Sequence, residues 1–385
     1  MRCTANDVGV MKILYIANVR LPTEKAHGIQ IMKACEAFVR AGHQLTLVVP
    51  ARKSPIREDS FAYYGIKTRF PLKRLFTLDT IGWGSVGYIF QSVFFGKIAT
   101  LYAWFHKSDV IYGRDEIVLA IVGLLTRRTL IWESHDGAWN FWTRMVVRRA
   151  SGIVVVTQGA ADFYVKHGVP REKLLAVSNG IDLDDFAHPE SKETARKRLG
   201  LPQDAKIALY IGKLDGWKGT DILLEASKLL TDVRVAIIGG TQTQVTELSK
   251  KYPHAFFLGY RPYTELPDNQ AAADVLVVPN TAKDPISVRF TSPLKLIAHL
   301  ASHRPIVVSD LPSTRWIADG VALFVTPDDS QALAMGIKKL IEDTAFAQEL
   351  ISRAQEKVTA FSWSKRAESI LCFIEGRFSG QVRDR

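Results

Sequence analysis

Short apolar runs separated by polar turns recur along the whole chain. Residues 12–18 (KILYIAN) form one run, a helical repeat of apolar positions then ends at Gly42, and a second run spans 44–50. A strand, a helix and a strand in such close succession are typical of a βαβ unit with buried parallel strands. The same pattern predicts further strands at 108–112, 129–132, 152–157, 174–178, 206–212, 234–239, 255–258, 274–279, 305–309 and 321–325.

The run 206–212 (KIALYIG) repeats the pattern of the first run and opens a second series of strands and helices. The segment that precedes it is charged and rich in Pro, Lys and Glu, as expected of a connection between domains. We therefore predict an α/β protein with two doubly wound domains, in which the cleft between the domains, beyond the carboxyl ends of the strands, is the default ligand site. One long sheet is the alternative, and the second start argues against it. The predicted boundaries are 11–186 for the first domain, 187–203 for the linker and 204–360 for the second domain.

One stretch, 81–105, is rich in Trp, Phe, Tyr and Ile. A helix that spans a bilayer needs ~20 nearly uncharged residues, whereas Gln91, Lys97 and several glycines interrupt this stretch. We therefore expect a buried or interfacial helix rather than a transmembrane one. The N-terminal residues lack the pattern of a secretory signal, so we expect a cytoplasmic protein.

The net charge is +11 and is concentrated in the first half of the chain. Residues 1–186 hold 24 basic and 16 acidic side chains, whereas 187–385 hold 26 and 23. The basic excess favours an anionic partner, and a merely solubilising surface is the alternative. Basic and aromatic residues mix along 52–74 and 141–149, which favours contact with an anionic membrane surface at the inner face of the membrane. No pattern typical of nucleic-acid binding is present.

A loop between a predicted strand and a predicted helix carries Gly212, Lys213 and Lys218. The glycine allows close approach of the backbone, and the helix that follows offers free N–H groups and a positive dipole end. These features suit a diphosphate, although a solvated loop with two surface lysines is the alternative. Gly239 and Gly240 end a later strand and, with Tyr260, are candidates for the nucleobase region.

A second candidate phosphate contact lies at 292–295. We expect Ser292 to cap a helix with Pro293 in its first turn, which would leave the amides of Leu294 and Lys295 free for the same phosphates. A well-capped helix without a ligand is the alternative.

Polar residues also follow the predicted strand 129–132. Loops at this end of a strand often carry function, and His135 and Asp136 could bind sugar hydroxyls or the reacting region. A structural pair is the alternative, and the Asn179-Gly180 turn is interpreted as architectural. The sequence has no Asp-x-Asp, HExxH, CxxC or GxSxG motif, so we expect neither a metal nor a resident cofactor nor a serine nucleophile.

Taken together, these residues resemble family 4 of the retaining glycosyltransferases, which have the GT-B fold of two facing Rossmann-like domains. The resemblance extends from Lys12 to about Phe373 and rests on the order and spacing of its pieces. These pieces are 12–18 with the Gly28 loop, 40–43, 112–114, 135–136, 177–182, 212–219, 292–296, 305–310 and 361–363.

The resemblance implies a nucleotide-sugar donor that is bound mainly by the C-terminal domain. Lys213 and Lys218 would hold its diphosphate together with the amides at 294–295, and Gly28 would lie in a loop that meets phosphates and acceptor. His135 would lie near the transferred sugar, with Asp136 and Arg114 as further contacts to donor sugar or acceptor. The resemblance also implies retention of anomeric configuration, and a C-terminal helix at 361–385 that returns to the first domain.

The sequence departs from the family where two glutamates usually stand eight positions apart. Phe290 and Ala298 occupy these positions, although the second glutamate usually binds the donor ribose. Losing such a hydrogen bond costs ~1.5–3 kcal/mol. Three hypotheses stay open: an active transferase in envelope or exopolysaccharide synthesis, a non-catalytic nucleotide-sugar-binding partner subunit, and a nucleotide-sugar epimerase.

Overall fold

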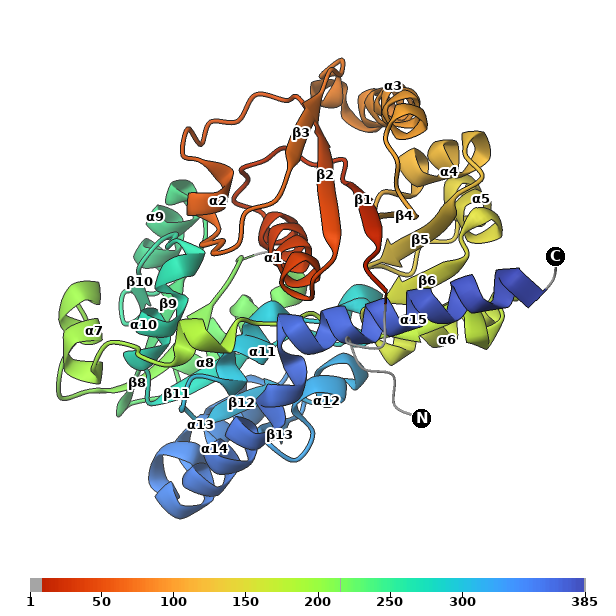
Figure 1. Cartoon of the computed structure of the whole chain (residues 1–385). Coiled ribbons are helices and arrows are strands. Elements are labelled where there is room, and N and C mark those ends of the chain that lie inside the picture. The colour runs from red at the N-terminus through yellow and green to blue at the C-terminus, as the bar shows by residue number, and fades with distance from the viewer. Residues whose placement is uncertain (1–8, 215, 384–385) are drawn as a thin grey trace. The chain divides into compact units, whose positions relative to one another are not determined.

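The computed structural model describes residues 9–214 and 216–383, which form two compact units. Unit 1 combines the chain up to Val177 with the segment from Trp363 onward, and unit 2 is Ser178–Ser362. Each unit has one parallel sheet with helices against it (Figure 1). The predicted fold class is therefore confirmed: two Rossmann-like α/β units, with the C-terminal segment part of the first.

Unit 1 is built on a parallel sheet of order β3-β2-β1-β4-β5-β6-β7. The central strand β1 (Lys12–Ile16) pairs with both β2 and β4, so the strand order reverses direction between β1 and β4. Ligands of doubly wound sheets bind at such a switch point, beyond the carboxyl ends of the strands. The other strands are β2 (Gln44–Pro50), β3 (Leu72–Leu75), β4 (Val110–Gly113), β5 (Thr129–Ser134), β6 (Gly152–Val155) and β7 (Leu174–Ala176).

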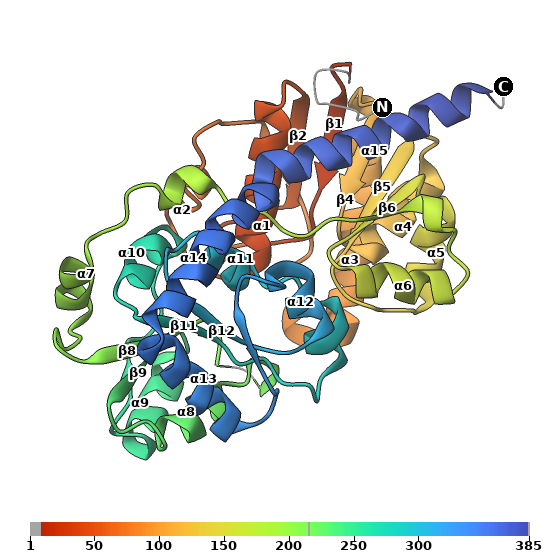
Figure 2. The same cartoon turned by 90° about the horizontal axis from the view of Figure 1, so that it is seen from below.

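The helices of unit 1 cover both faces of this sheet. The long C-terminal helix α15 (Trp363–Arg383) contacts α1 and β6, and Figure 2 shows it running along α1. The other helices are α1 (Ala26–Arg40), α2 (Ser60–Tyr63), α3 (Gly84–Phe105), α4 (Glu116–Leu125), α5 (Phe141–Arg149) and α6 (Gln158–Lys166).

Unit 2 repeats the same topology, with strand order β10-β9-β8-β11-β12-β13 and a switch point between β8 and β11. Its strands are β8 (Lys206–Ile211), β9 (Val233–Ile238), β10 (Phe256–Phe257), β11 (Val275–Val278), β12 (Ile306–Ser309) and β13 (Leu323–Val325). Its helices are α7 (Lys192–Leu199), α8 (Thr220–Ser227), α9 (Gln242–Lys251), α10 (Leu266–Ala271), α11 (Leu294–Leu300), α12 (Pro312–Ala318), α13 (Ser330–Glu342) and α14 (Thr344–Val358).

Strand β8 shows why the strands are continuous apolar runs rather than alternating ones. Ile207 and Leu209 belong to the hydrophobic cluster on one face of the sheet, and Ala208 and Tyr210 to the cluster on the other. Successive side chains of a strand point to opposite faces, so a strand covered on both sides must be apolar at every position.

Three segments differ from the sequence-based expectation. The predicted linker 187–203 contains α7, and Ala195 and Leu199 of this helix belong to the core of unit 2. Strand β3 was not predicted, because its sequence LKRL is short and its two basic residues are exposed at the sheet edge. Residues Ile286–Phe290 form a π-helical turn before α11. In α7, charged surface residues hid the buried positions.

The aromatic stretch forms α3, as expected. None of the helices in the described part of the chain is both long enough and apolar enough to cross a bilayer.

Candidate active site

A glycine and two lysines lie around the switch point of unit 2. Gly212 and Lys218 follow β8, and Lys295 lies in the first turn of α11. Gly212 follows the strand with φ 150°, and its N–H donates to the carbonyl of Ile238 (2.9 Å). A Cβ on Gly212 would lie 2.8 Å from the Nζ of Lys295, so a larger residue would displace this amine. The sequence therefore brings the end of β8 and the start of α11 into direct contact.

Lys295 is the most unusual side chain of this site. Its ammonium group is buried, lies 3.9 Å from the centroid of the Tyr210 ring, and has no hydrogen-bond partner among the described residues. Burial, and secondarily the charge of Lys218, lower the pKa of Lys295 well below the usual value of lysine. A buried amine without a partner is costly, and it is stabilised when an anion supplies the missing charge and hydrogen bonds.

Two further residues complete the group of four that we call the lysine cluster: Gly212, Lys218, Asn280 and Lys295. The Nζ of Lys218 lies 3.3 Å from the centroid of the Trp217 ring. Asn280 follows β11, is fully buried, and neither its amide nitrogen nor its amide oxygen has a partner among the described residues. Unpaired buried polar groups at a switch point are what a bound polar ligand would satisfy.

Tight backbone contacts hold the loop that carries Lys218. Gly219 has φ 66°, and a Cβ there would lie 1.8 Å from the carbonyl oxygen of Pro279. The amide of Thr281 donates to the carbonyl of Trp217 (3.3 Å). The loop after β8 is thus packed onto the segment after β11, next to Asn280.

The remaining residues that were predicted to contact the diphosphate or the nucleobase lie outside the lysine cluster. The side chain of Lys213 is exposed, while its carbonyl accepts a hydrogen bond from the Tyr210 hydroxyl (2.6 Å). Gly239 and Gly240 both have positive φ, and a Cβ on Gly239 would lie 1.9 Å from the carbonyl oxygen of Gly212. These glycines support the Gly212 turn, and Tyr260 is exposed. A nucleobase contact at these three residues stays a prediction.

Ser292 does not cap α11, in contrast to the expectation. The residue before the helix is Pro293, and Leu294 and Lys295 are the first two residues of the helix. The Ser292 hydroxyl instead accepts from the amide of Asn179 (3.1 Å), and its carbonyl accepts from the Asn179 side chain (3.0 Å). The Asn179 turn is thereby anchored within unit 2, as its architectural interpretation requires.

Gly28 is also placed differently. It lies in the first turn of α1 rather than in a loop, and its N–H donates to the carbonyl of Lys25 (3.0 Å). A Cβ there would lie 2.1 Å from the Tyr64 hydroxyl. The residue therefore serves the packing of Tyr64, and its amide is already used.

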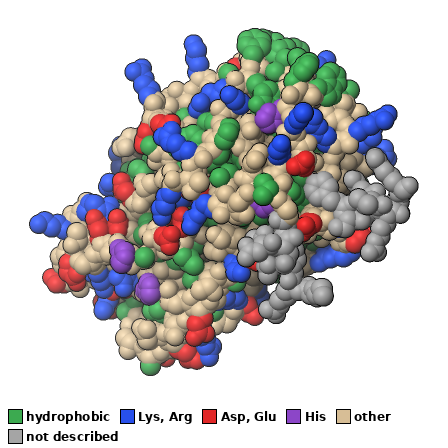
Figure 3. All heavy atoms as spheres, viewed as in Figure 1, with side chains coloured by type: hydrophobic (Ala, Val, Ile, Leu, Met, Phe, Trp, Pro, Cys, Tyr) green, Lys and Arg blue, Asp and Glu red, His purple; other side chains and the backbone are tan. Residues whose placement is uncertain are grey.

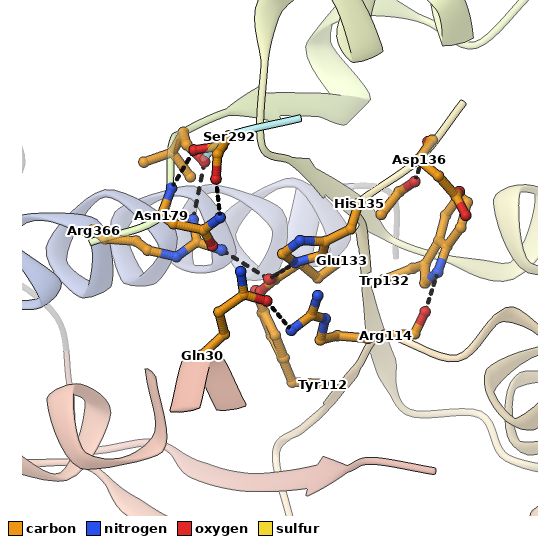
Figure 4. Close-up of polar contacts among 12 residues, drawn as sticks. Gln30, Tyr112, Arg114, Trp132, Glu133, His135, Asp136, Asn179, Ser292 and Arg366 are labelled. Atoms are coloured by element: carbon orange, nitrogen blue, oxygen red, sulfur yellow. Dashed lines mark hydrogen bonds and ion pairs between the residues drawn. The ribbon is translucent and has the colours of Figure 1, made fainter. Parts of the chain in front are cut away.

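In unit 1, the end of β5 carries a buried polar network (Figure 4). Glu133 accepts a hydrogen bond from the Tyr112 hydroxyl, contacts His135 Nε2, and pairs with Arg366 of α15 at 2.9 Å. Both side chains of the Glu133–Arg366 pair are nearly inaccessible. Residues two apart in an extended segment lie on the same side, so Glu133 is well placed to hold His135.

The network sets the protonation state of His135. Burial alone would raise the pKa of Glu133, but Arg366 and His135 hold it well below its usual value. Burial, and then the charge of Arg114, lower the pKa of His135 to about 4. At neutral pH the imidazole is therefore neutral, its Nε2–H donates to the Glu133 carboxylate, and Nδ1 is an acceptor.

The other two predicted residues of this loop region lie around His135. Arg114 follows β4, at the switch point of unit 1, and donates to the Gln30 side chain (2.9 Å). The exposed Asp136 has its backbone carbonyl held by the Ser134 hydroxyl (2.9 Å). The described residues contain no group of three or more His, Cys, Asp or Glu that could hold a metal ion.

Comparison with known protein families shows to which family the chain belongs. The model of Glycosyltransferase Family 4 matches residues 28–185, and the model of Glycosyl transferases group 1 matches residues 205–343. The chain belongs to glycosyltransferase family 4.

Relatives of this family 4 glycosyltransferase share part of its length. A D-inositol 3-phosphate glycosyltransferase of Streptomyces avermitilis is 29% identical over 247 residues, which are 58% of this chain and 51% of that protein. The teichuronic acid biosynthesis glycosyltransferase TuaC of Bacillus subtilis is 30% identical over 194 residues, which are 50% of this chain and 48% of TuaC. The chain thus matches about half the length of these curated relatives.

A solved structure supports the fold over nearly the whole family 4 chain. The structure of HepE from Anabaena in complex with UDP-glucose has a TM-score of 0.72 at 18% identity. The match covers 97% of this chain and all of that one. At this identity the likeness shows the shared GT-B fold.

Sequence reasoning did not predict the roles of three side chains of the candidate site, which are Asn280, Glu133 and the amine of Lys295. The Glu-x-His spacing at the end of a strand was a usable signal for Glu133. Asn280 directly follows a predicted strand at the switch point, which was a weaker one. Phe290 and Ala298, the two departures from the family pattern, are both buried apolar residues of unit 2.

Proposed function

We propose that the protein is a retaining, metal-independent glycosyltransferase that moves a sugar from a nucleoside-diphosphate sugar to a saccharide or lipid-linked acceptor. The observation that carries the proposal is the buried, unpaired amine of Lys295 beside Lys218 at the switch point of unit 2. Retention is part of the proposal because the family resemblance implies it.

In the proposed mechanism, the lysine cluster holds the diphosphate and stabilises the negative charge that grows on it as the glycosidic bond breaks. Preorganised cations in a site with little water are effective at this task and can supply the charge that a metal supplies elsewhere. Lys295 gains most on binding, because the anion provides the counter-charge that the free protein lacks. The departing phosphate would assist removal of the proton from the acceptor hydroxyl.

His135 has a separate role in this proposal. Its Nδ1 lone pair accepts a hydrogen bond from a sugar hydroxyl, and Glu133 fixes the ring and its tautomer. Glu133 is thus a positioning residue, whereas His135 contacts substrate. Asp136 and Arg114 are further candidates for contacts to donor sugar or acceptor.

We place the acceptor at an anionic membrane surface on the cytoplasmic side, in envelope or exopolysaccharide synthesis. The basic first half of the chain supports this placement, as does the resemblance to TuaC, which is named for teichuronic acid biosynthesis. The UDP-glucose complex of HepE makes UDP sugars the first donors to test.

A panel of UDP, GDP and ADP sugars tests the proposal. Slow release of sugar and nucleoside diphosphate by the wild type, lost in Lys218→Ala, is the expected result. An unchanged rate in Lys218→Ala would remove the proposed role of this lysine. The Lys213→Ala variant shows whether the exposed lysine contributes as well.

A non-catalytic, nucleotide-sugar-binding partner subunit is the second candidate. Phe290 and Ala298 favour it, because neither side chain can accept a hydrogen bond from the donor ribose. Donor binding without turnover in the same panel would support this function. An altered sugar on an intact nucleotide would instead indicate an epimerase.

A further inference from the structure

In helix α3, small and polar side chains are buried and many large apolar ones are exposed, which is the reverse of the distribution expected for a surface helix. Its buried positions are mostly small or polar, including Gly87, Ser92, Gly96, Ala99 and Ala103. A Cβ on Gly96 would lie 3.1 Å from Ile121 of α4, so small residues allow the two helices to approach closely. Except for the buried Phe95, the large apolar residues of α3 are exposed or half-buried.

These large residues form a continuous apolar surface, which we call the α3 outer face. At 100° per residue, Val86, Phe90, Lys97, Leu101 and Trp104 lie within a narrow stripe along the helix. The α3 outer face comprises Trp83 (76% exposed), Val86 (76%), Phe90 (52%), Leu101 (48%), Trp104 (57%) and Phe105 (85%). Hydrophobic side chains gather at the corresponding place in Figure 3, over the position of α3 in Figure 1.

Neighbouring elements extend the same surface. Phe76 is 65% exposed and its ring packs against Phe94 of α3 at 5.9 Å between centroids. At the other end, the Trp104 indole donates to the carbonyl of Leu125 (3.0 Å), which places the exposed end of α4 beside it. Monomeric proteins rarely leave so many large apolar side chains exposed beside one another unless the surface binds a partner.

Basic side chains lie beside and within this surface, and we call Lys73, Lys97, Lys107 and Arg127 the basic rim; all four are exposed. Lys97 lies in the middle of the stripe, and α3 contains no acidic residue. The charges of Arg128 and Lys73 both lower the pKa of His106, so these cations lie near the end of α3. A hollow of about 540 Å³ beside this end is lined by Lys12, Arg69 and Lys107 among others.

We propose that the α3 outer face and its basic rim dock this protein onto a bilayer that contains anionic lipid. The apolar side chains enter the boundary between headgroups and acyl chains, and the lysine and arginine side chains contact lipid phosphates. Tryptophans near both ends of the helix suit an interface, and the stem of Lys97 can extend toward the headgroups.

Charge favours this occupant over a second copy of the chain. The chain carries +11, and an α3-to-α3 contact would bring two basic rims together, whereas an anionic bilayer attracts them. Two of the basic residues at 52–74 are already engaged in ion pairs, since Arg52 pairs with Asp79 and Arg69 with Asp59. The proposed docking surface is therefore centred on α3, and Lys73 is the part of that stretch that contributes to it.

The inner side of α3 connects this surface to the ligand edge of the sheet in unit 1. Gln91 donates to the side chain of Asn18 (3.0 Å), which follows β1, and Asn18 donates to Asp115 (3.1 Å), which follows β4. A docked α3 thus lies directly behind the loops of the switch point. This deepens the proposed function, on which it rests for the lipid-linked acceptor.

Flotation with vesicles tests the docking surface without any donor or acceptor. The full chain is mixed with vesicles of equal parts phosphatidylcholine and phosphatidylglycerol, or of phosphatidylcholine alone, at low and high salt. We expect binding to the anionic vesicles that falls at high salt, and a loss of about tenfold or more in Val86→Ser/Phe90→Ser. A Lys97→Glu/Lys107→Glu variant should weaken binding mainly to the anionic vesicles.

Phe141→Ser is the matched control, because Phe141 of α5 is 62% exposed in the same unit and adjoins the basic segment 144–149. It should bind as the wild type does. Loss of binding in Phe141→Ser but not in the α3 variant would overturn the proposal, as would absence of wild-type binding at low salt. Light scattering tests whether the face instead binds a second copy of the chain. A wild-type dimer and a monomeric α3 variant, with equal vesicle binding, would show that it does.

Donor turnover with a soluble acceptor is measured in the same variants. Neither Val86 nor Phe90 belongs to the site, so turnover should stay at the wild-type level. Failure of the wild type to bind vesicles, with its turnover intact, would reject the docking surface alone, whereas missing turnover in all proteins would reject the proposed function.

Discussion

At the scale of single residues, the site depends on groups that are costly for the free protein. The Lys295 amine is buried without a partner, and Glu133 and Arg366 form a buried ion pair beside His135. Protein folds tolerate such groups mainly where a ligand or a reaction needs them. Their substitution should therefore separate stability from function.

Lys295→Met should make the free protein more stable and its ligand binding weaker. Methionine fills similar space without an unpaired polar group, so we expect the free energy of unfolding to rise by ~1–3 kcal/mol. Binding of UDP should weaken about tenfold or more, since a charge-assisted contact is lost. Urea unfolding and titration calorimetry measure the two effects, and Lys213→Met, at an exposed lysine, should leave stability unchanged.

The difference in free energy of unfolding between Lys295→Met and the wild type should depend on pH. An unfolded lysine takes up its proton near pH ~10.4, whereas burial lowers the pKa of Lys295 in the folded state. Between the two pKa values the unfolded state binds more protons, so wild-type stability rises with pH in this window. The advantage of Lys295→Met should therefore shrink from neutral pH toward pH ~10, and an advantage that grows would contradict the assignment.

Glu133→Gln should weaken both the fold and the sugar site. Removing one partner of a buried ion pair leaves Arg366 uncompensated, which typically costs ~3–5 kcal/mol. The amide also no longer fixes the tautomer of His135, so kcat should fall even where the variant is folded. Unfolding curves and kinetics check both effects, and Glu133→Gln/Arg366→Met should be more stable than the sum of the single variants predicts.

At the scale of elements, positive-φ glycines position the loops of unit 2. Gly219 and Gly200 have nearly the same φ, 66° and 68°, but only the first lies against another backbone segment. The contact with Pro279 thus joins the loop after β8 to the segment after β11, which carries Asn280. The lysine cluster depends on this contact as well as on its side chains.

Gly219→Ala should therefore be much more harmful than Gly200→Ala. Both variants force a side chain into the left-handed region at a cost of ~1–2 kcal/mol. At Gly219 the Cβ would also meet the Pro279 carbonyl at 1.8 Å, whereas nothing lies within 4 Å of it at Gly200. Denaturant unfolding and UDP binding compare the two, and equal losses would show that the contact at Gly219 is unimportant.

At the scale of the whole molecule, the two units differ in how the chain builds them. Unit 2 is one continuous segment with hydrophobic clusters on both faces of its sheet. Unit 1 is discontinuous, because it combines the N-terminal part of the chain with α15. Arg366 of α15 pairs with Glu133, and the apolar residues Ile370, Leu371 and Ile374 of this helix are buried. The C-terminal helix is thus part of the core of the unit that begins the chain.

The two units should behave differently as fragments. Residues 178–362 should unfold cooperatively and retain UDP binding, since the lysine cluster and its supporting loops lie within them. Residues 9–177 alone should bind a hydrophobic dye, because the removal of α15 exposes its docking site and leaves Glu133 without Arg366. A cooperative, native-like fragment 9–177 would contradict the structural role of α15.

The sequence alone determined the two parallel sheets, because strands buried on both faces must be continuous apolar runs, and it located the Gly212 and His135 loops at strand ends. It could not give the roles of Asn280, Glu133 or the Lys295 amine, since each depends on neighbours from distant segments that only packing brings together. For the same reason it placed Gly28 in a loop and Ser292 at a helix cap, whereas Gly28 lies in α1 against Tyr64 and the Ser292 hydroxyl accepts from Asn179. Composition marked the 81–105 helix as unusual, but only the tertiary structure decided that Phe95 and its small residues face the core, whereas large ones such as Phe90 and Trp104 face outward.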